Sequence, residues 1–215
     1  MREPTENKLT SKRERLAFIF AAFAIILRMA SDWIFATGGP LPYQLLQAFF
    51  LFISILILRH DLEVIYLRGG QIRLSIKWGL LAIPLGFIFG LGDAFLSYGR
   101  PLWPDLPEFC FMAANNVFFS AVEELEFRGF LLLWLMRKKI SPTLIILIVA
   151  LVASLAHSHR FLEFDIRSIV ITIAVNAYWT WIVYRTRCIW GAWVAHATWN
   201  IFVLLPILGT SNNIR

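Results

Sequence analysis

Charged residues are scarce in this 215-residue chain, at 16% of the total, whereas hydrophobic residues reach 59%. A soluble domain usually has about a quarter of its residues charged and about half apolar, so the composition argues against a soluble domain. The chain also has 9 Trp and 19 Phe, and aromatic residues are common at membrane interfaces. The composition therefore predicts an integral membrane protein surrounded by membrane lipid.

Cysteine is also rare, because only Cys110 and Cys188 are present. Two cysteines make neither a disulfide framework nor a CxxC metal site. The HExxH motif and any evident Ser–His or Cys–His arrangement are absent, which removes the usual signatures of zinc, serine and cysteine hydrolases. The formal net charge is +6, but no basic stripe with interleaved aromatics lies on a soluble face, so we expect no nucleic-acid partner.

Apolar runs recur along the chain at lengths that suit membrane spans of about 20 residues. Turn-forming residues separate them, as in the Gly69–Gly70 pair and at Ser141–Pro142. We predict an all-α, polytopic membrane bundle of about seven transmembrane helices over residues 16–208, between a tail at 1–15 and a tail at 209–215. The seven predicted spans are 16–36, 43–58, 76–96, 109–136, 143–157, 166–184 and 189–208.

Lysine and arginine are distributed unequally between alternate connections. They precede the first span and follow the second, fourth and sixth spans, while the opposite connections have few. The positive-inside rule therefore predicts a cytoplasmic N-terminus and a C-terminus that faces out. The first 15 residues are too long and too acidic for the start of a signal peptide, so we expect a retained tail. The expected location is the bacterial inner (plasma) membrane.

The predicted fourth span contains a run of ionisable residues deep inside an apolar segment, at Glu123, Glu124, Glu126 and Arg128. An ionisable group at mid-membrane is costly, and it therefore indicates function. Glu124 and Arg128 are four residues apart, so they share a helix face and are expected to pair. Glu123 lies about 100° around the helix. We expect it to lie apart from any cation, in an environment that suits general acid–base chemistry.

Polar residues in other spans are candidate partners. His196 and Asn200 share a face of the last span, and both residue types hydrogen-bond to an oxyanion or between helices. The fifth span ends with His157 and His159, which are two residues apart, so at most one points into a shared site. Arg28 and Asp32 in the first span are four apart and are interpreted as a structural pair.

The combination resembles the CPBP family, the CAAX-protease and bacteriocin-processing intramembrane proteases, which are also called the Abi family. The run from Glu123 to Gly129 matches the EExxFRG form of the family's first motif. Leu155 to His159 is similar to its FxxxH motif, with Leu in place of Phe. His196 and Asn200 resemble its HxxxN motif. The resemblance covers roughly residues 109–205.

The resemblance implies a glutamic-type mechanism. Glu123 would activate the attacking water with help from His159, and His196 and Asn200 would stabilise the oxyanion of the tetrahedral intermediate. His157 is the alternative to His159 if the register of the motif slips.

The resemblance also implies that Glu124 and Arg128 support the site, and it assigns no role to Glu126. We predict that no cofactor is needed. The alternative is one zinc ion bound by Glu123, His159 and His196, because two His and one Glu form a known catalytic zinc set.

The sequence therefore predicts an intramembrane endopeptidase that cuts a membrane-associated or C-terminally anchored peptide or protein, such as one with a C-terminal sorting signal. A CAAX-type protease of prenylated proteins is the alternative substrate class. Two other classes of function remain open, a non-catalytic membrane scaffold or immunity protein and a small transporter that uses the same buried acids.

Overall fold

The computed structural model describes residues 12–35, 41–98, 106–157 and 166–211, and in these ranges the chain is helical and contains no strand. The predicted all-α class is therefore confirmed. The elements are α1 (Lys12–Phe35), α2 (Leu41–Ile57), α3 (Ile72–Leu80), α4 (Ala82–Tyr98), α5 (Leu106–Glu124), the π-helix η1 (Leu125–Leu131), α6 (Leu132–Met136), α7 (Pro142–Leu155), α9 (Ile166–Thr186) and α10 (Trp190–Ser211).

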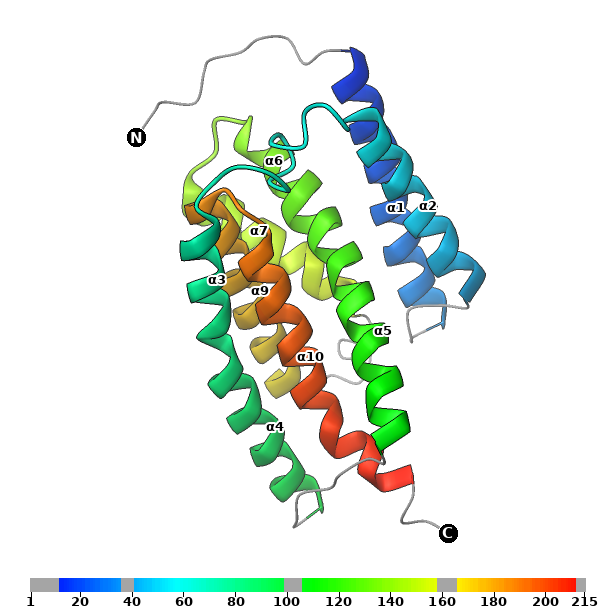
Figure 1. Ribbon diagram of the computed structural model, residues 1–215, viewed down its shortest axis with the longest axis vertical. Coiled ribbons are helices and arrows are strands. Elements are labelled where there is room, and N and C mark those ends of the chain that lie inside the picture. The colour runs from blue at the N-terminus through cyan, green and yellow to red at the C-terminus, as the bar shows by residue number, and fades with distance from the viewer. Residues whose placement is uncertain (1–11, 36–40, 99–105, 158–165, 212–215) are drawn as a thin grey trace.

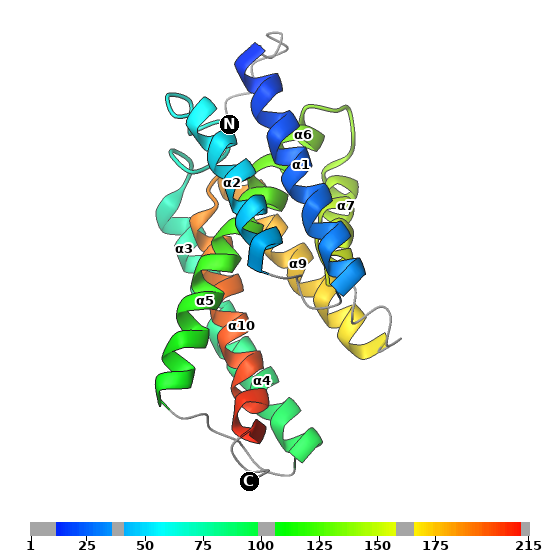
Figure 2. The same cartoon turned by 90° about the vertical axis from the view of Figure 1, so that its right-hand side faces the viewer.

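The helices run side by side along the long axis of the molecule (Figure 1). The last helix, α10, packs against α3, α4, α5 and α9, while α1 and α2 form a pair on the far side of α5. A turn by 90° shows α1 in front, with α7 and α9 on one side and α5 and α10 on the other (Figure 2). The acidic run lies at the end of α5 and in η1, where η1 packs against α1 and α5 packs against α10.

The outer faces of the helices are apolar. Large side chains are exposed there, including Ile26 (63%), Leu96 (73%) and Ile166 (74%), as expected for contact with lipid. Three helical segments are long and apolar enough to cross a membrane by themselves, and two shorter helices are also apolar. Each of the seven predicted spans coincides with helix over most of its described length, with short non-helical ends and a break at Leu81 in the third span. The number of spans that cross the membrane and the cytoplasmic N-terminus stay predictions.

One end of the bundle gathers the connections that the sequence marks as basic. The α2–α3 connection bonds to the α9–α10 connection, because Gln71 N–H donates to the carbonyl of Thr186 (2.8 Å) and Trp190 Nε1 donates to that of Leu67 (3.1 Å). Gly70 has φ +67°, and a Cβ there would lie 2.2 Å from the carbonyl oxygen of Arg187. The predicted Gly69–Gly70 turn therefore packs the α2–α3 connection against the α9–α10 connection, and only glycine fits at position 70.

The start of α10 packs on α3 with almost no space between the backbones. A Cβ at Gly191 would lie 1.9 Å from the carbonyl oxygen of Ser75. The Gly191 N–H donates to Ser75 Oγ (3.0 Å), and that hydroxyl donates to the carbonyl of Cys188 (2.9 Å). This close approach fixes the register of α10, which carries His196 and Asn200.

Gly191→Ala is expected to lower the free energy of unfolding by about 1–3 kcal/mol, because overpacking forces the two backbones apart. Unfolding of the purified protein in detergent by added SDS measures the change. Gly92→Ala is the matched control, since a Cβ at Gly92 meets no atom within 4 Å. Equal losses in the two variants would contradict the close-packing explanation.

Candidate functional site

The acidic motif lies where the helix widens. The predicted fourth span is α5, η1 and α6 in sequence, and η1 is a π-helix in which Leu132 N–H donates to the carbonyl of Phe127, five residues back. A π-turn inside an α-helix is rare and is frequent at functional sites. Sequence periodicity did not predict it, because the motif was interpreted at ordinary α-helical spacing.

Glu124 and Arg128 form the predicted pair. Arg128 Nη1 donates to Glu124 Oε1 (3.0 Å), and the two side chains are 1% exposed or less. The same oxygen, Glu124 Oε1, lies 2.8 Å from His196 Nδ1 on α10. Because a carboxylate oxygen accepts hydrogen bonds, His196 Nδ1 carries a proton and its other ring nitrogen, Nε2, points away from Glu124.

The Arg128 guanidinium is held by α9 as well. It donates to Asn176 Oδ1, to the Asn176 carbonyl (3.3 Å) and to Thr180 Oγ1 (3.2 Å). Asn176 Nδ2 in turn donates to Ser154 Oγ on α7 (3.3 Å). The pair therefore joins η1, α9, α7 and α10. Asn176 and Thr180 were not predicted from sequence, although polar residues four apart in an apolar span are a usable signal.

Glu123 has a cation partner, which corrects the expectation that it lies apart from one. Arg28 Nη2 on α1 donates to Glu123 Oε1 at 2.6 Å, and the side chains are 10% and 8% exposed. The other oxygen, Glu123 Oε2, lies 3.6 Å from His196 Nε2. The sequence interpretation paired Arg28 with Asp32, whose side chain lies outside the described residues. It missed the contact with Glu123 because the two residues are 95 positions apart.

Glu126 is also fully buried. Gln47 Nε2 on α2 donates to Glu126 Oε1 at 2.7 Å. Glu126 therefore lies against α2, whereas Glu123 and Glu124 contact α1 and α10. Sequence reasoning gave Gln47 no role.

Packing orients the two candidate residues on α10. The ring of His196 stacks on Trp179, with centroids 4.2 Å apart and 19° between the planes. Asn200, one turn further along, donates from Nδ2 to Ser120 Oγ on α5 at 3.4 Å. The last span therefore presents both polar side chains toward α5, as their shared face predicts.

The end of α7 brings one of the two histidines near this cluster. His157 is half-buried, its Nδ1 lies 3.2 Å from the carbonyl oxygen of Ala153, and the ring is within electrostatic range of Glu123, Arg28 and His196. His159 lies outside the described residues, so its role stays a prediction. His157 is the motif histidine whose position is described, and the assignment of the second motif to His157 or His159 stays a prediction.

Within the described ranges, no group of three or more His, Cys, Asp or Glu side chains is placed to hold a metal ion. The zinc set predicted as an alternative includes His159, which those ranges leave out. Both the metal-free mechanism and the zinc alternative stay predictions.

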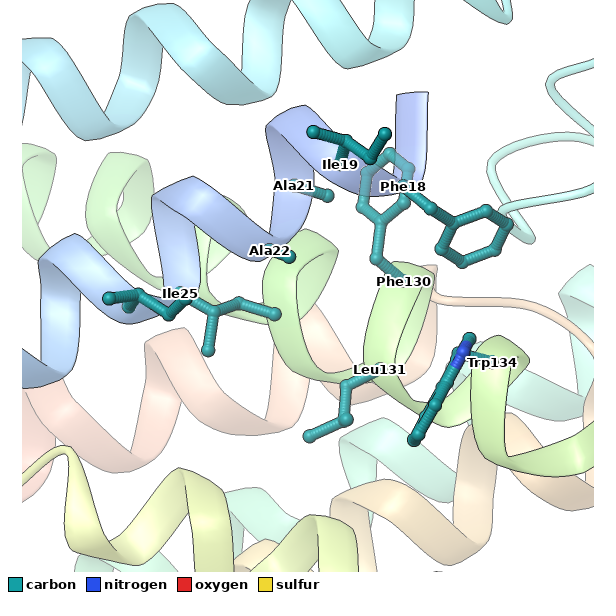
Figure 3. A pocket seen from close by; sticks show the side chains of 9 residues that line it. Phe18, Ile19, Ala21, Ala22, Ile25, Phe130, Leu131 and Trp134 are labelled. Atoms are coloured by element: carbon teal, nitrogen blue, oxygen red, sulfur yellow. The ribbon is translucent and has the colours of Figure 1, made fainter. Parts of the chain in front are cut away.

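An apolar groove of about 440 Å³ lies between α1 and the η1–α6 segment. In Figure 3, Ile25 on α1 and Leu131 on η1 face this space, and Phe18 and Trp134 lie further along it. The groove is lined by apolar and aromatic side chains. It borders α1, which carries Arg28, and η1, which directly follows the end of α5 where Glu123 lies, but neither Arg28 nor Glu123 lines it.

A buried cluster of carboxylates, guanidinium groups and imidazole inside an apolar helical bundle defines a membrane protein with an embedded polar site. Residues 105–202, slightly under half of the chain, match the Rce1-like family, described as type II CAAX prenyl endopeptidase Rce1-like. The match confirms the resemblance that the motifs indicate, and it supports a peptidase at the level of the family. Neither the curated proteins nor the solved structures contain a match to this chain. Helices α1 to α4 precede the matched region.

Proposed function

We propose that this protein is an intramembrane endopeptidase in which Glu123 activates water for attack on a peptide bond. The observation that carries the proposal is the placement of Glu123 Oε2 and His196 Nε2, 3.6 Å apart in a buried polar cluster. That separation is too long for a hydrogen bond, and it lets one water molecule contact both atoms. A positioned carboxylate that takes a proton from water is a general base, and the protonated Glu123 then returns this proton to the amine that leaves as the C–N bond breaks.

His196 and Asn200 are the proposed partners for the oxyanion of the tetrahedral intermediate. His196 already donates from Nδ1 to Glu124. A second proton on Nε2 would place the imidazolium between Glu124 and Glu123, with an N–H available to a developing negative charge. Asn200 Nδ2 is a second donor on the same helix face. Glu124 and Arg128 act by orienting His196 and do not contact the substrate.

The proposed substrate is a membrane-associated peptide or protein that is cut close to its membrane segment, such as one with a C-terminal sorting signal, in the bacterial plasma membrane. The match to the Rce1-like family of CAAX prenyl endopeptidases favours a second substrate class, prenylated proteins with a C-terminal CAAX sequence. Cleavage of a fluorescence-quenched peptide, measured with and without a farnesylated cysteine, separates the two substrate classes, because only the CAAX-type activity requires the prenyl group.

A comparison of membrane proteins in cells with and without this protein tests the proposal. The expected result is at least one membrane protein whose terminus is shorter in cells that have it. Vesicles that contain the purified protein provide the second measurement. Proton flux in these vesicles with no shortened terminus in cells would favour a transporter and overturn the proposal.

His157 and His159, the two histidines of the second motif, offer a matched pair of variants. We expect His157→Ala to lower the processing rate about 100-fold or more, as for loss of a residue that takes part in proton transfer, because His157 lies near Glu123. We expect His159→Ala to have a smaller effect. Pulse-chase labelling of the shortened protein measures both rates, and the reverse order would assign the motif to His159, as the sequence interpretation did.

A further inference from the structure

Arg28 contributes to the candidate site from outside the matched region. It lies on α1, whereas the match begins at residue 105. Its guanidinium is 2.6 Å from Glu123 Oε1, and both side chains are largely buried. A buried charge in a membrane-spanning helix is costly unless it is paired. The pairing of these two residues from separate helices is therefore a specific feature of the site.

We propose that Arg28 is a positioning residue for Glu123, an inference that rests on the proposed function of Glu123 as general base. Arg28 binds Oε1 and leaves Oε2 facing His196 Nε2. To act as a general base, Glu123 must be ionised and must lie within hydrogen-bond reach of the proton that it takes. A guanidinium is a matched, charge-assisted partner for a carboxylate. Arg28 thus fixes which oxygen of Glu123 meets the water.

The packing of α1 places Arg28 next to Glu123. A row of small residues on α1, at Ala17, Ala21 and Ala24, is buried in a cluster with Phe130 of η1. Small residues let helices approach closely in a membrane. The apolar groove lies beside this contact, with Ile25 on one side and Leu131 on the other (Figure 3). The row of alanines and Phe130 thus belong to one buried cluster, and Arg28 lies one turn beyond Ala24 on α1.

A purely structural role for Arg28 predicts different behaviour. In that case its removal would loosen the bundle without acting on Glu123 in particular. Arg13 provides the comparison, because it lies on the same helix and its Nη2 donates to the carbonyl of Ile57 on α2 at 2.9 Å. Arg13 connects α1 to α2 and has no contact with the acidic motif among its described bonds.

The experiment measures by pulse-chase how fast the substrate protein with a shortened terminus appears. It compares cells that contain matched amounts of the wild-type protein, Arg28→Gln, Arg28→Lys, Arg13→Gln or Glu123→Gln. We expect Arg28→Gln to lower the rate about 10- to 100-fold, as for a displaced reacting group. Arg28→Lys should restore part of the rate, because it keeps the charge but lacks the planar fork. Arg13→Gln should match the wild type.

Thermal unfolding of the purified proteins provides a readout that does not depend on activity. Arg28→Gln should lower the midpoint, and Glu123→Gln added to it should recover part of the loss, because the unpaired carboxylate is then removed. If Arg28→Gln does not accumulate, Arg28→Lys and the double variant still test the contact.

The outcomes separate the two proposals. If Glu123→Gln processes at the wild-type rate, the proposed function fails, and the role of Arg28 fails with it. If Glu123→Gln is inactive but the accumulating Arg28 variants match the wild type or Arg13→Gln, the positioning role alone is wrong. A low rate in Arg28→Gln, with partial rescue by lysine and a normal Arg13→Gln, supports it.

Discussion

Glu123→Gln is expected to abolish nearly all processing, with a fall in rate of about 10²- to 10⁴-fold. The substitution keeps the size and shape of the side chain but replaces the carboxylate that takes the proton from water. Gln retains an acceptor oxygen for Arg28 Nη2, so the bundle should persist. The effect is measured by pulse-chase, as the rate at which the substrate with a shortened terminus appears in cells with matched amounts of the two proteins.

Glu126→Gln is the matched control for this prediction. It is the same change three residues away, and its side chain is equally buried but contacts Gln47 on α2. We expect a change of no more than about threefold. A wild-type rate in Glu123→Gln would show that this glutamate is not the general base. An equal loss in both variants would show that the assay reports damage to the bundle rather than loss of the base.

Arg128→Met is expected to lower the free energy of unfolding by about 3–5 kcal/mol, the usual cost of removing one partner of a buried ion pair. Arg128 contacts Glu124, Asn176 and Thr180, so the change leaves a buried carboxylate and two further polar groups without this donor. Unfolding by added SDS in detergent measures the loss. The amount of Arg128→Met protein that accumulates in the membrane should also be lower than that of the wild type.

Two further variants test whether the broken ion pair causes the loss of stability in Arg128→Met. Arg185→Met, at the exposed end of α9, should change the free energy of unfolding by less than about 0.5 kcal/mol. Arg128→Met combined with Glu124→Leu should cost less than Arg128→Met alone, because no buried charge is then left unpaired. If the single and double variants unfold alike, the loss comes from packing and the ion pair is not its source.

The pairs that sequence spacing could predict are those that lie within one helix. Glu124 and Arg128 are four apart and pair as expected, and His196 and Asn200 share a face of α10. The turn at Gly69–Gly70 and the start of α7 at Ser141, whose hydroxyl caps Leu144 N–H (3.4 Å), were equally clear. In each case one to four residues of local sequence contain the whole signal.

The contacts between helices could not be predicted in this way. Arg28 reaches Glu123 across 95 positions, and Gln47 reaches Glu126 across 79. Spacing within Arg28's own helix instead favoured Asp32 as its partner. The choice between partners depends on which helix faces which, and helical periodicity does not contain that information. The π-helix at the motif was missed as well, because periodicity was interpreted at ordinary α-helical spacing and a π-turn is a rare departure from it.

The buried acidic run shows what the sequence and the tertiary structure each determine. The sequence alone determined that the protein is helical, that it belongs in a membrane, and that Glu123, Glu124, Glu126 and Arg128 lie inside the apolar region, because composition and local spacing are sufficient for those conclusions. Only the tertiary structure decided how the carboxylates differ. Glu123 faces Arg28 and His196, Glu124 joins Arg128 to His196, and Glu126 lies against Gln47. The physical reason is that a carboxylate acquires its chemical character from its neighbours, and here most of those neighbours come from other helices.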